Sequence, residues 1–316
     1  MKKAMSGFDL RAMARELDAL KGAYIKKAYM PHYEQIVLRV NPKEAEQRDI
    51  VFVRGERVYT SQRDRPMPMT PPPFAMVLRK HLRNARLTGV EQVGFDRVLA
   101  FRFDTKNGQR TLYVEVFRDG NIILVDEEGV IVQPLTHASY AGRTLKKGVS
   151  YTPPPAATDP YALDEASLGE LLMASDRDLV STLGGKVNLG ATHANAVCAL
   201  AAHEPNSPTE QADGKAVFDA LQTLLRRLED SEEGHLILRL EADDPEHWLQ
   251  TCASMDQNQR QAWLSQRAIE ATPILLPQHA DMPRVSFRSL CETIDVWKGI
   301  HDCLLYTSDA ADETCR

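Results

Sequence analysis

Apolar and polar positions alternate over short runs through the first 150 residues, and two helical stretches interrupt them. Leu10, Met13, Ala14 and Leu17 recur at helical spacing, which predicts a helix over 9–20 with Asp9 as its N-cap. Phe74 opens a second predicted helix, over 74–84, after a proline-rich loop. Short β-branched or aromatic runs between turn residues predict the strands 24–29, 35–41, 49–53, 56–61, 87–93, 96–104, 110–117, 121–125 and 130–133. Residues 1–155 are therefore expected to form an α+β domain with a mainly antiparallel sheet.

The pattern changes after a linker that begins at Tyr151 and contains three consecutive prolines. Residues 160–230 are predicted to be helical, with a clear amphipathic helix over 217–228. Residues 231–302 are predicted to be a mixed segment, with a strand over 235–240 and helices over 248–269, that leads into a truncated coiled coil. The fold class expected for the whole chain is α+β.

Charge is distributed unevenly along the 316 residues. The net charge of −6 combines a first half (1–150) at +9 with a remainder at −15. A basic half on an acidic chain suits a phosphate-rich partner, although uneven surface charge alone would give the same count. Five widely spaced cysteines without a CxxC pair favour reduced thiols, and no apolar run of 18 residues is present.

The segment 71–103 carries the most specific pattern. It reads Pro-Pro-x-Phe-x-x-x-Leu-Arg-Lys-x-Leu from Pro71, followed by Asp96-Arg97 and alternating aromatics. This pattern resembles the NFACT family of ribosome quality-control proteins, which includes NEMF in animals and RqcH in bacteria. The general likeness is to archaeal members, and it covers residues 7–300.

The resemblance implies a fold and a function. The N-terminal region would be similar to that of formamidopyrimidine-DNA glycosylases, followed by a helix-hairpin-helix. The protein would bind a stalled large ribosomal subunit with peptidyl-tRNA and recruit a tRNA for C-terminal tailing, in the cytoplasm. It would itself be no enzyme and would need no cofactor, small-molecule substrate or membrane.

The resemblance also assigns residues to tRNA binding. Asp9, Asp96 and Arg97 match family positions linked to tRNA, and an arginine can fork onto a phosphate or a base edge. From the residues alone, a helix cap and an ion pair explain the same three positions. The match at both positions favours the tRNA interpretation.

Two further groups are candidate phosphate contacts. Arg79, Lys80, Arg83 and Arg86 are expected to form a cationic stripe on one helix, which suits an RNA backbone as well as a solvated surface. Asn188 and Gly190 lie in the expected hairpin, where backbone N–H groups at a helix start can hold a phosphate. An ordinary helix–turn–helix packing unit explains that turn equally well.

The sequence contains no motif for metal binding or for nucleotide binding. The nine histidines lack metal-ligand spacing, and neither a Walker loop nor a dinucleotide-binding glycine motif occurs, so no metal or nucleotide is expected. Glu115 is expected to be a surface or ion-pairing residue. A glycosylase-like enzyme is one alternative, but Met1-Lys2-Lys3 offers no Pro-Glu start. A fibronectin-binding adhesin is another, which the missing signal peptide and the basic first half oppose.

The last segment, 303–316, resembles translated sequencing adapter. It follows the family-like residues 295–299 abruptly, where a coiled coil should begin. The natural protein is therefore expected to continue beyond about Asp302, and a native acidic tail is the alternative.

Overall fold

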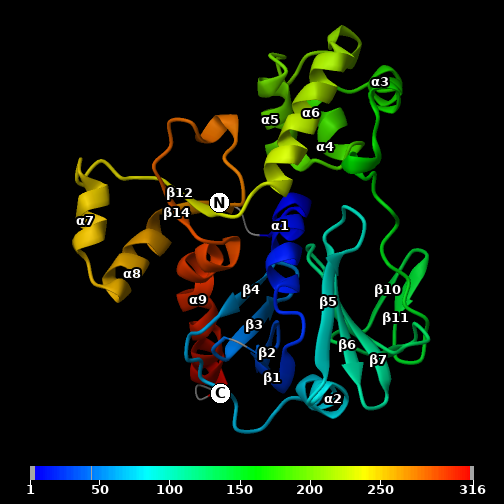
Figure 1. Ribbon diagram of the computed structural model, residues 1–316, viewed down its shortest axis with the longest axis vertical. Helices are drawn as coiled ribbons and strands as arrows, with labels where there is room; N and C mark the ends of the chain where they lie inside the picture. The colour runs from blue at the N-terminus through cyan, green and yellow to red at the C-terminus, as the bar shows by residue number, and fades with distance from the viewer. Residues whose placement is uncertain (1–3, 44, 314–316) are drawn as a thin grey trace.

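The computed structural model describes residues 4–43 and 45–313 and has a mixed α+β architecture built on a large antiparallel sheet (Figure 1). The expected α+β class is confirmed. The sheet has the order β4-β3-β2-β1-β5-β6-β7-β8-β9. Its strands are β1 (Tyr24–His32), β2 (Gln35–Asn41), β3 (Arg48–Val53), β4 (Arg57–Ser61), β5 (Arg86–Gln92), β6 (Val98–Thr105), β7 (Gly108–Glu115), β8 (Ile122–Val125) and β9 (Ile131–Pro134).

The sheet consists of two meanders that meet at one point. Strands β1 to β4 pair in sequence order, and so do strands β5 to β9. Between β1 and β5, the paired register contains only Tyr24 and Arg86. Backbone hydrogen bonds flank this pair, between Leu87 and the Gly22–Ala23 segment on one side and between Ile25 and the Asn84–Ala85 segment on the other. Beyond this short overlap, β1 continues beside α2 and β5 continues beside α1.

The helix α1 (Gly7–Asp18) begins two residues earlier than the sequence pattern predicts. Its N-cap is Ser6, whose hydroxyl accepts from the backbone N–H of Asp9 at 3.2 Å. Asp9 is therefore not the cap but the third helical residue, and its carboxylate accepts from the Ser6 backbone N–H at 2.6 Å. Such a capping box satisfies two donors at the helix start, which a single-residue cap does not.

The helix α2 (Pro73–Leu82) ends two residues earlier than predicted. Arg83 is already extended, and Asn84 has a φ of 58°, a left-handed conformation that a helix does not continue through. Arg86 is consequently the first residue of β5. The expected stripe of four cations on one helix is therefore wrong, since only Arg79 and Lys80 lie within α2.

The remaining elements form a helical segment and a second small sheet. The helical segment contains η1 (Pro160–Ala162), α3 (Glu165–Met173), α4 (Leu179–Gly185), α5 (Gly190–Leu200), η2 (Thr209–Gln211) and α6 (Gly214–Glu229). The small sheet, in the order β13-β12-β14, and its helices comprise β12 (Gly234–Leu238), α7 (Trp248–Ser254), α8 (Gln257–Arg267), β13 (Ala268–Thr272), η3 (Pro277–His279), β14 (Arg284–Phe287) and α9 (Leu290–Glu313). The predicted domain bounds within these segments stay predictions.

The predicted adapter-derived tail falls on the end of α9. The helix runs to Glu313, whereas the side chains after Cys303 and the residues 314–316 lie outside the described part. The origin of this segment stays a prediction.

A hairpin that the sequence pattern did not predict follows β9 and contacts the last residue of β7, Glu115. The strands β10 (Ala138–Tyr140) and β11 (Arg143–Leu145) pair with each other. Arg143 donates to both carboxylate oxygens of Glu115, at 2.5 and 3.0 Å, and the Tyr151 hydroxyl lies 3.1 Å from the same carboxylate. Glu115 is fully buried, so it is an ion-pairing residue and not a surface one.

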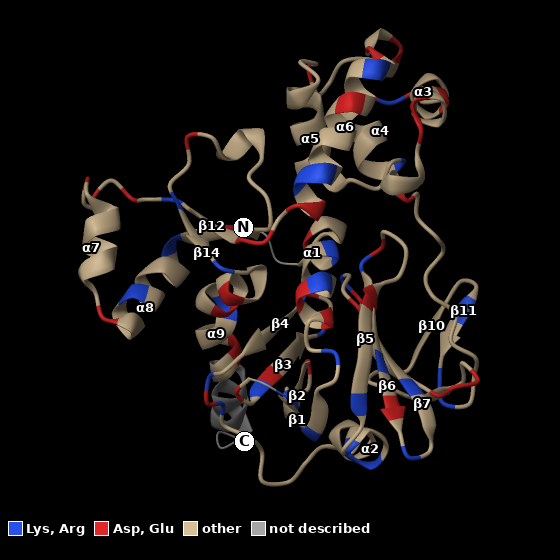
Figure 2. Ribbon diagram, in the orientation of Figure 1, with Lys and Arg blue, Asp and Glu red and all other residues tan. Residues whose placement is uncertain are grey.

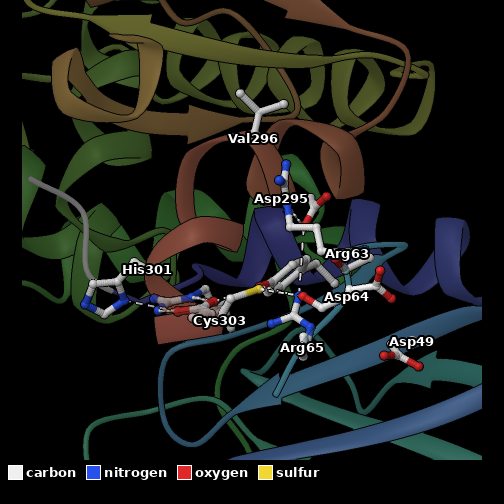
Figure 3. A network of polar contacts seen from close by, with 12 residues as sticks. Asp49, Arg63, Asp64, Arg65, Asp295, Val296, His301 and Cys303 are labelled. Carbon is white, nitrogen blue, oxygen red and sulfur yellow. Dashed lines mark hydrogen bonds and ion pairs between the residues drawn. The ribbon is translucent and has the colours of Figure 1, made fainter. Parts of the chain in front are cut away.

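A second buried ion pair anchors α9 to β4. Arg57 donates from Nε and Nη2 to the two carboxylate oxygens of Asp302, at 3.0 and 2.6 Å, and the Tyr59 hydroxyl donates to the same carboxylate at 2.8 Å. About two helical turns earlier, Asp295 faces Arg63 at 3.1 Å and Arg65 at 3.9 Å (Figure 3). The side chains of Arg57 and Asp302 are 6% and 0% exposed, so this pair is shielded from solvent.

The pKa values of two buried carboxyl groups on α9, those of Asp302 and Asp295, are shifted in opposite directions. Burial alone would raise the pKa of Asp302, but hydrogen bonds from His301 and Arg57 and the charge of Arg57 hold it well below its ordinary value. Burial raises the pKa of Asp295 above its ordinary value in spite of the charges of Arg63 and Arg65. Folding therefore stabilises the ionised form of Asp302 and disfavours that of Asp295.

We predict that Asp302→Asn lowers the free energy of unfolding by about 3–5 kcal/mol at neutral pH, because it removes the buried partner of the Arg57 charge and leaves that charge to the partly exposed Glu56 carboxylate. Asp295→Asn is the matched control on the same helix and should cost much less. Urea titrations of both variants measure this difference. In the wild type, the Asp302 contribution is present above the ordinary aspartate pKa and is lost as the pH falls towards its depressed folded pKa. An equal loss in both variants, or none in Asp302→Asn, would contradict the anchoring role.

Candidate nucleic-acid interface

The start of α1 forms the base of the candidate interface. Asp9 is 1% exposed, and its carboxylate also accepts from the Ser6 hydroxyl at 2.7 Å. The side chain is thus committed to holding the first turn of α1 inside the protein. The geometry favours a positioning contribution from Asp9 over a direct contact with RNA.

Asp96 and Arg97 lie at the surface in the turn between β5 and β6. The Asp96 carboxylate accepts from the backbone N–H of Arg97 at 2.6 Å and so fixes the turn locally. Among the described residues, no ion pair joins the Arg97 guanidinium to a carboxylate. Arg97 is exposed and its donors are available to a partner.

The backbone of this turn is tied to α1. The Gln92 side-chain amide donates to the carbonyls of Gly7 and of Asp96, both at 2.9 Å. Gly7 packs so closely on Phe95 that a Cβ at this position would lie 3.2 Å from its ring. The first turn of α1 and the Asp96 turn are therefore held together by direct hydrogen bonds and packing.

An aromatic cluster beneath the turn extends this unit to the helical segment. Phe8 meets Phe95 edge-on, with ring centroids 5.1 Å apart, and stacks on His193 of α5 at 3.8 Å. Tyr161 approaches Phe95 at 5.7 Å. Sequence reasoning missed His193 and Tyr161, because a single histidine or tyrosine in a helical segment carries no motif.

The turn between α4 and α5 abuts the Asp96 turn directly. Asn188 adopts a φ of 64° and donates from its side-chain amide to the Phe95 carbonyl at 2.8 Å and to the Thr158 carbonyl at 3.3 Å. Gly190, with a φ of 68°, starts α5, which has no side-chain cap. The structure thus brings Asn188 into contact with the turn that carries Asp96 and Arg97, and Gly190 follows two residues later at the exposed start of α5.

The helical segment is held against α1 by a second set of contacts. Glu229 at the end of α6 accepts from Arg11 and Arg15, each at 3.0 Å, and from the Tyr161 hydroxyl at 2.6 Å. Burial alone would raise the pKa of Glu229, but the Tyr161 and Arg11 hydrogen bonds and the charges of Arg11 and Arg15 hold it below its ordinary value. This cluster ties the end of α6 and Tyr161 to α1, the helix whose first turn also contacts the Asp96 turn.

The cations around α2 lie elsewhere. Arg86 starts β5 and Asp96 follows its far end, so the seven residues of the strand separate them by about 20 Å at roughly 3.3 Å per residue. Arg79 is half-buried and donates from Nε to the Ala28 carbonyl at 2.7 Å. Lys80, Arg83 and Arg86 are exposed. The predicted site residues therefore form two groups, one at each end of β5 (Figure 2).

Among the described residues, no group of three or more His, Cys, Asp or Glu side chains could hold a metal ion. None of the described helices combines the length and apolarity that crossing a bilayer demands. Residues 1–3, on which the glycosylase alternative depends, lie outside the described part.

Known proteins similar to this chain give the interface a context. An archaeal Rqc2 homolog, aRqcH of Methanocaldococcus jannaschii, is 29% identical over 251 residues, which cover 76% of this chain and 37% of that protein. The human ribosome quality control complex subunit NEMF is 31% identical over 178 residues, covering 56% and 16%. The chain thus spans well under half the length of these relatives.

The fold has a counterpart among solved structures. The N-terminal part of the fibronectin/fibrinogen-binding protein of Streptococcus suis matches with a TM-score of 0.68 and 23% identity, over 94% of this chain and all of that one. The profile of the family described as NFACT N-terminal and middle domains matches residues 6–295. Since that match spans nearly the whole chain, the protein belongs to the NFACT family.

Proposed function

We propose that this protein is a ribosome quality-control factor that binds the large ribosomal subunit obstructed by peptidyl-tRNA and recruits a tRNA for C-terminal tailing. Membership of a family whose archaeal and eukaryotic members are named for ribosome quality control carries this proposal. Bond formation would remain with the ribosome, so the protein would act as a binding factor in the cytoplasm and not as an enzyme.

In this proposal, the Asp96 turn is the tRNA contact. Arg97 is exposed, uncommitted to an ion pair among the described residues, and mounted on a turn held by α1 and the Asn188 amide. A guanidinium on a rigid support can donate to a phosphate or to a base edge of a splayed nucleotide. Asp96 would keep the turn in shape, and Asp9 would act through the start of α1.

The α4–α5 turn would contribute a phosphate contact as part of a helix-hairpin-helix. Gly190, Ala191 and Thr192 are exposed at the start of an uncapped helix, next to Arg97's turn. Backbone N–H groups and the helix dipole favour an anion at this position. The cations Arg79, Lys80, Arg83 and Arg86 would act separately, at the other end of β5.

A second candidate function is adhesion, since the similar Streptococcus suis structure is titled a fibronectin/fibrinogen-binding protein. Surface plasmon resonance with immobilised fibronectin, beside purified large ribosomal subunits, discriminates the two. Ribosomal binding without fibronectin binding supports the quality-control proposal, and the reverse supports adhesion.

We predict that the double variant Asp96→Ala, Arg97→Ala keeps the wild-type melting temperature, because both side chains lie at the surface. Its tRNA affinity should fall by about 1–3 kcal/mol if Arg97 makes a bidentate contact. Filter binding with total tRNA and thermal unfolding measure the two quantities.

The matched control is Arg118→Ala, Asp119→Ala, which removes the same two residue types from the exposed turn after β7. It should bind tRNA like the wild type. Equal losses in the two variants would mean that any charge at this end of the sheet matters, and the specific role of the Asp96 turn would be rejected.

We also predict that Asn188→Gly weakens tRNA binding several-fold with little loss of stability. Glycine tolerates the positive φ, so the substitution removes the bonds to the Phe95 and Thr158 carbonyls without straining the turn. Asn195→Ala removes a side-chain amide from the same helix pair, where it contacts only Ala191 within α5, and serves as control. Wild-type affinity in Asn188→Gly would show that the two turns work independently.

A further inference from the structure

A groove of about 720 Å³ runs between β1 and α2, at the end of β5 remote from the Asp96 turn. Cations from both walls line it. Lys26 and Lys27 come from β1, Arg79 and Lys80 from α2, and Arg83 from the turn that follows α2. Figure 2 shows these basic segments on α2 and on the adjoining ends of β1 and β5. Sequence reasoning identified the α2 side and missed the two lysines.

The groove lies where α2 takes the place of β5 beside β1. Backbone hydrogen bonds join Ile25 to Asn84 and Ala85, and further along β1 the helix α2 packs against the strand. Arg79 donates from Nε to the carbonyl of Ala28, which is buried in β1, and so ties α2 to the strand. Lys26 and Lys27 of the same strand are exposed beside the basic helix.

A β-bulge turns both lysines towards solvent. Ile25 pairs with Val40 and Lys27 pairs with Arg39, so Lys26 is the extra residue of β1 opposite β2. In a regular strand, Lys26 and Lys27 would point to opposite faces, and one would enter the core. With the bulge, both are exposed. Bulges are a recurrent means of re-aiming side chains at functional sites.

The positive charge of the groove is not neutralised by the protein. Among the described residues, none of the five cations pairs with a carboxylate; Lys27 and Arg79 instead lie over the Tyr29 ring, at 5.2 and 5.4 Å from its centroid. The basic surface continues around α2. Burial, and then the charges of Arg110, Lys80 and Lys147, lower the pKa of His81.

We propose that this groove binds the sugar–phosphate backbone of RNA, at a site separate from the Asp96 turn. Cations on two facing walls can follow a strand of phosphates, and the half-exposed side chain of Met76 adds an apolar contact for sugars or bases. The contact is independent of base sequence, because it is made by lysine and arginine side chains to phosphates. This inference rests on the proposed function for its choice of an RNA partner over an acidic protein.

The test uses the whole chain and a 30-nucleotide poly(U) as probe. The first wall is neutralised by Lys26→Gln, Lys27→Gln and the second by Lys80→Gln, Arg83→Gln. Arg226→Gln, Arg227→Gln on α6 removes two adjacent exposed cations elsewhere and is the control. Fluorescence anisotropy across a salt series gives the affinity and its salt dependence, and circular dichroism confirms folding.

Each wall variant should lower poly(U) affinity about tenfold and reduce the slope of log K against log salt by about 1.4, for two lost contacts with a single strand. The control should change neither quantity. A wild-type slope in either wall variant overturns the proposal, since a groove site needs both walls. So does equal competition by polyglutamate of the same total charge, which would indicate a general anion surface.

Failure of this inference and failure of the proposed function are distinguishable. In one outcome, the wall variants lose poly(U) binding but the wild-type chain does not co-sediment with large ribosomal subunits. This outcome would support RNA binding in the groove and reject the ribosomal role. Unchanged poly(U) binding in the wall variants, with normal co-sedimentation and a tRNA defect in Asp96→Ala, Arg97→Ala, would reject the groove alone.

Discussion

One turn of α1 holds the ends of two other helices. Arg15 donates to the carbonyls of Leu228 and Glu229, at 2.6 and 2.7 Å, at the C-terminus of α6. The neighbouring Glu16 accepts from the backbone N–H groups of Leu290 and Cys291, at 2.6 and 2.8 Å, at the N-terminus of α9. A cation therefore meets the negative end of one helix dipole and an anion the positive end of another, and both satisfy backbone groups that have no partner within their own helices. The large sheet, the helical segment and the C-terminal segment all meet at this helix.

The same helix also holds the candidate interface in place. At the start of α1, Phe8 packs between Phe95 and His193. The carbonyl of the preceding Gly7 accepts a hydrogen bond from the Gln92 side-chain amide. A partner that contacts the Asp96 turn thus contacts a surface joined to α5 and to α1 at once. Functional side chains on such a support lose little freedom when they bind, which lowers the entropic cost of recognition.

Local pattern predicted the strands well and the contacts between distant segments poorly. The strand at 35–41 was predicted with its observed bounds, because its alternation ends at turn residues on both sides. The cap at Ser6 was missed, since aspartate and serine are both good caps and only the reciprocal bond to Asp9 decides between them. The stripe through Arg86 failed because the left-handed Asn84, which sequence alone allows but does not require, ends the helix. Asn188 was identified as tolerant of left-handed geometry, but its bond to a carbonyl 93 residues away could not be read locally.

The short overlap of β1 and β5 around the Tyr24–Arg86 pair separates two candidate surfaces of different character. At the Asp96 end, β5 is fully paired with β6 and lies beneath α1, so the turn is short, fixed and suited to a directional contact. At the Arg86 end, β5 is preceded by α2, and the groove between α2 and β1 is bordered by long lysine and arginine side chains. Such side chains attract phosphates without demanding one geometry, whereas a guanidinium on a fixed turn discriminates among geometries. The two ends of β5 therefore border different surfaces, a groove with long cationic side chains beside its start and a fixed turn at its end.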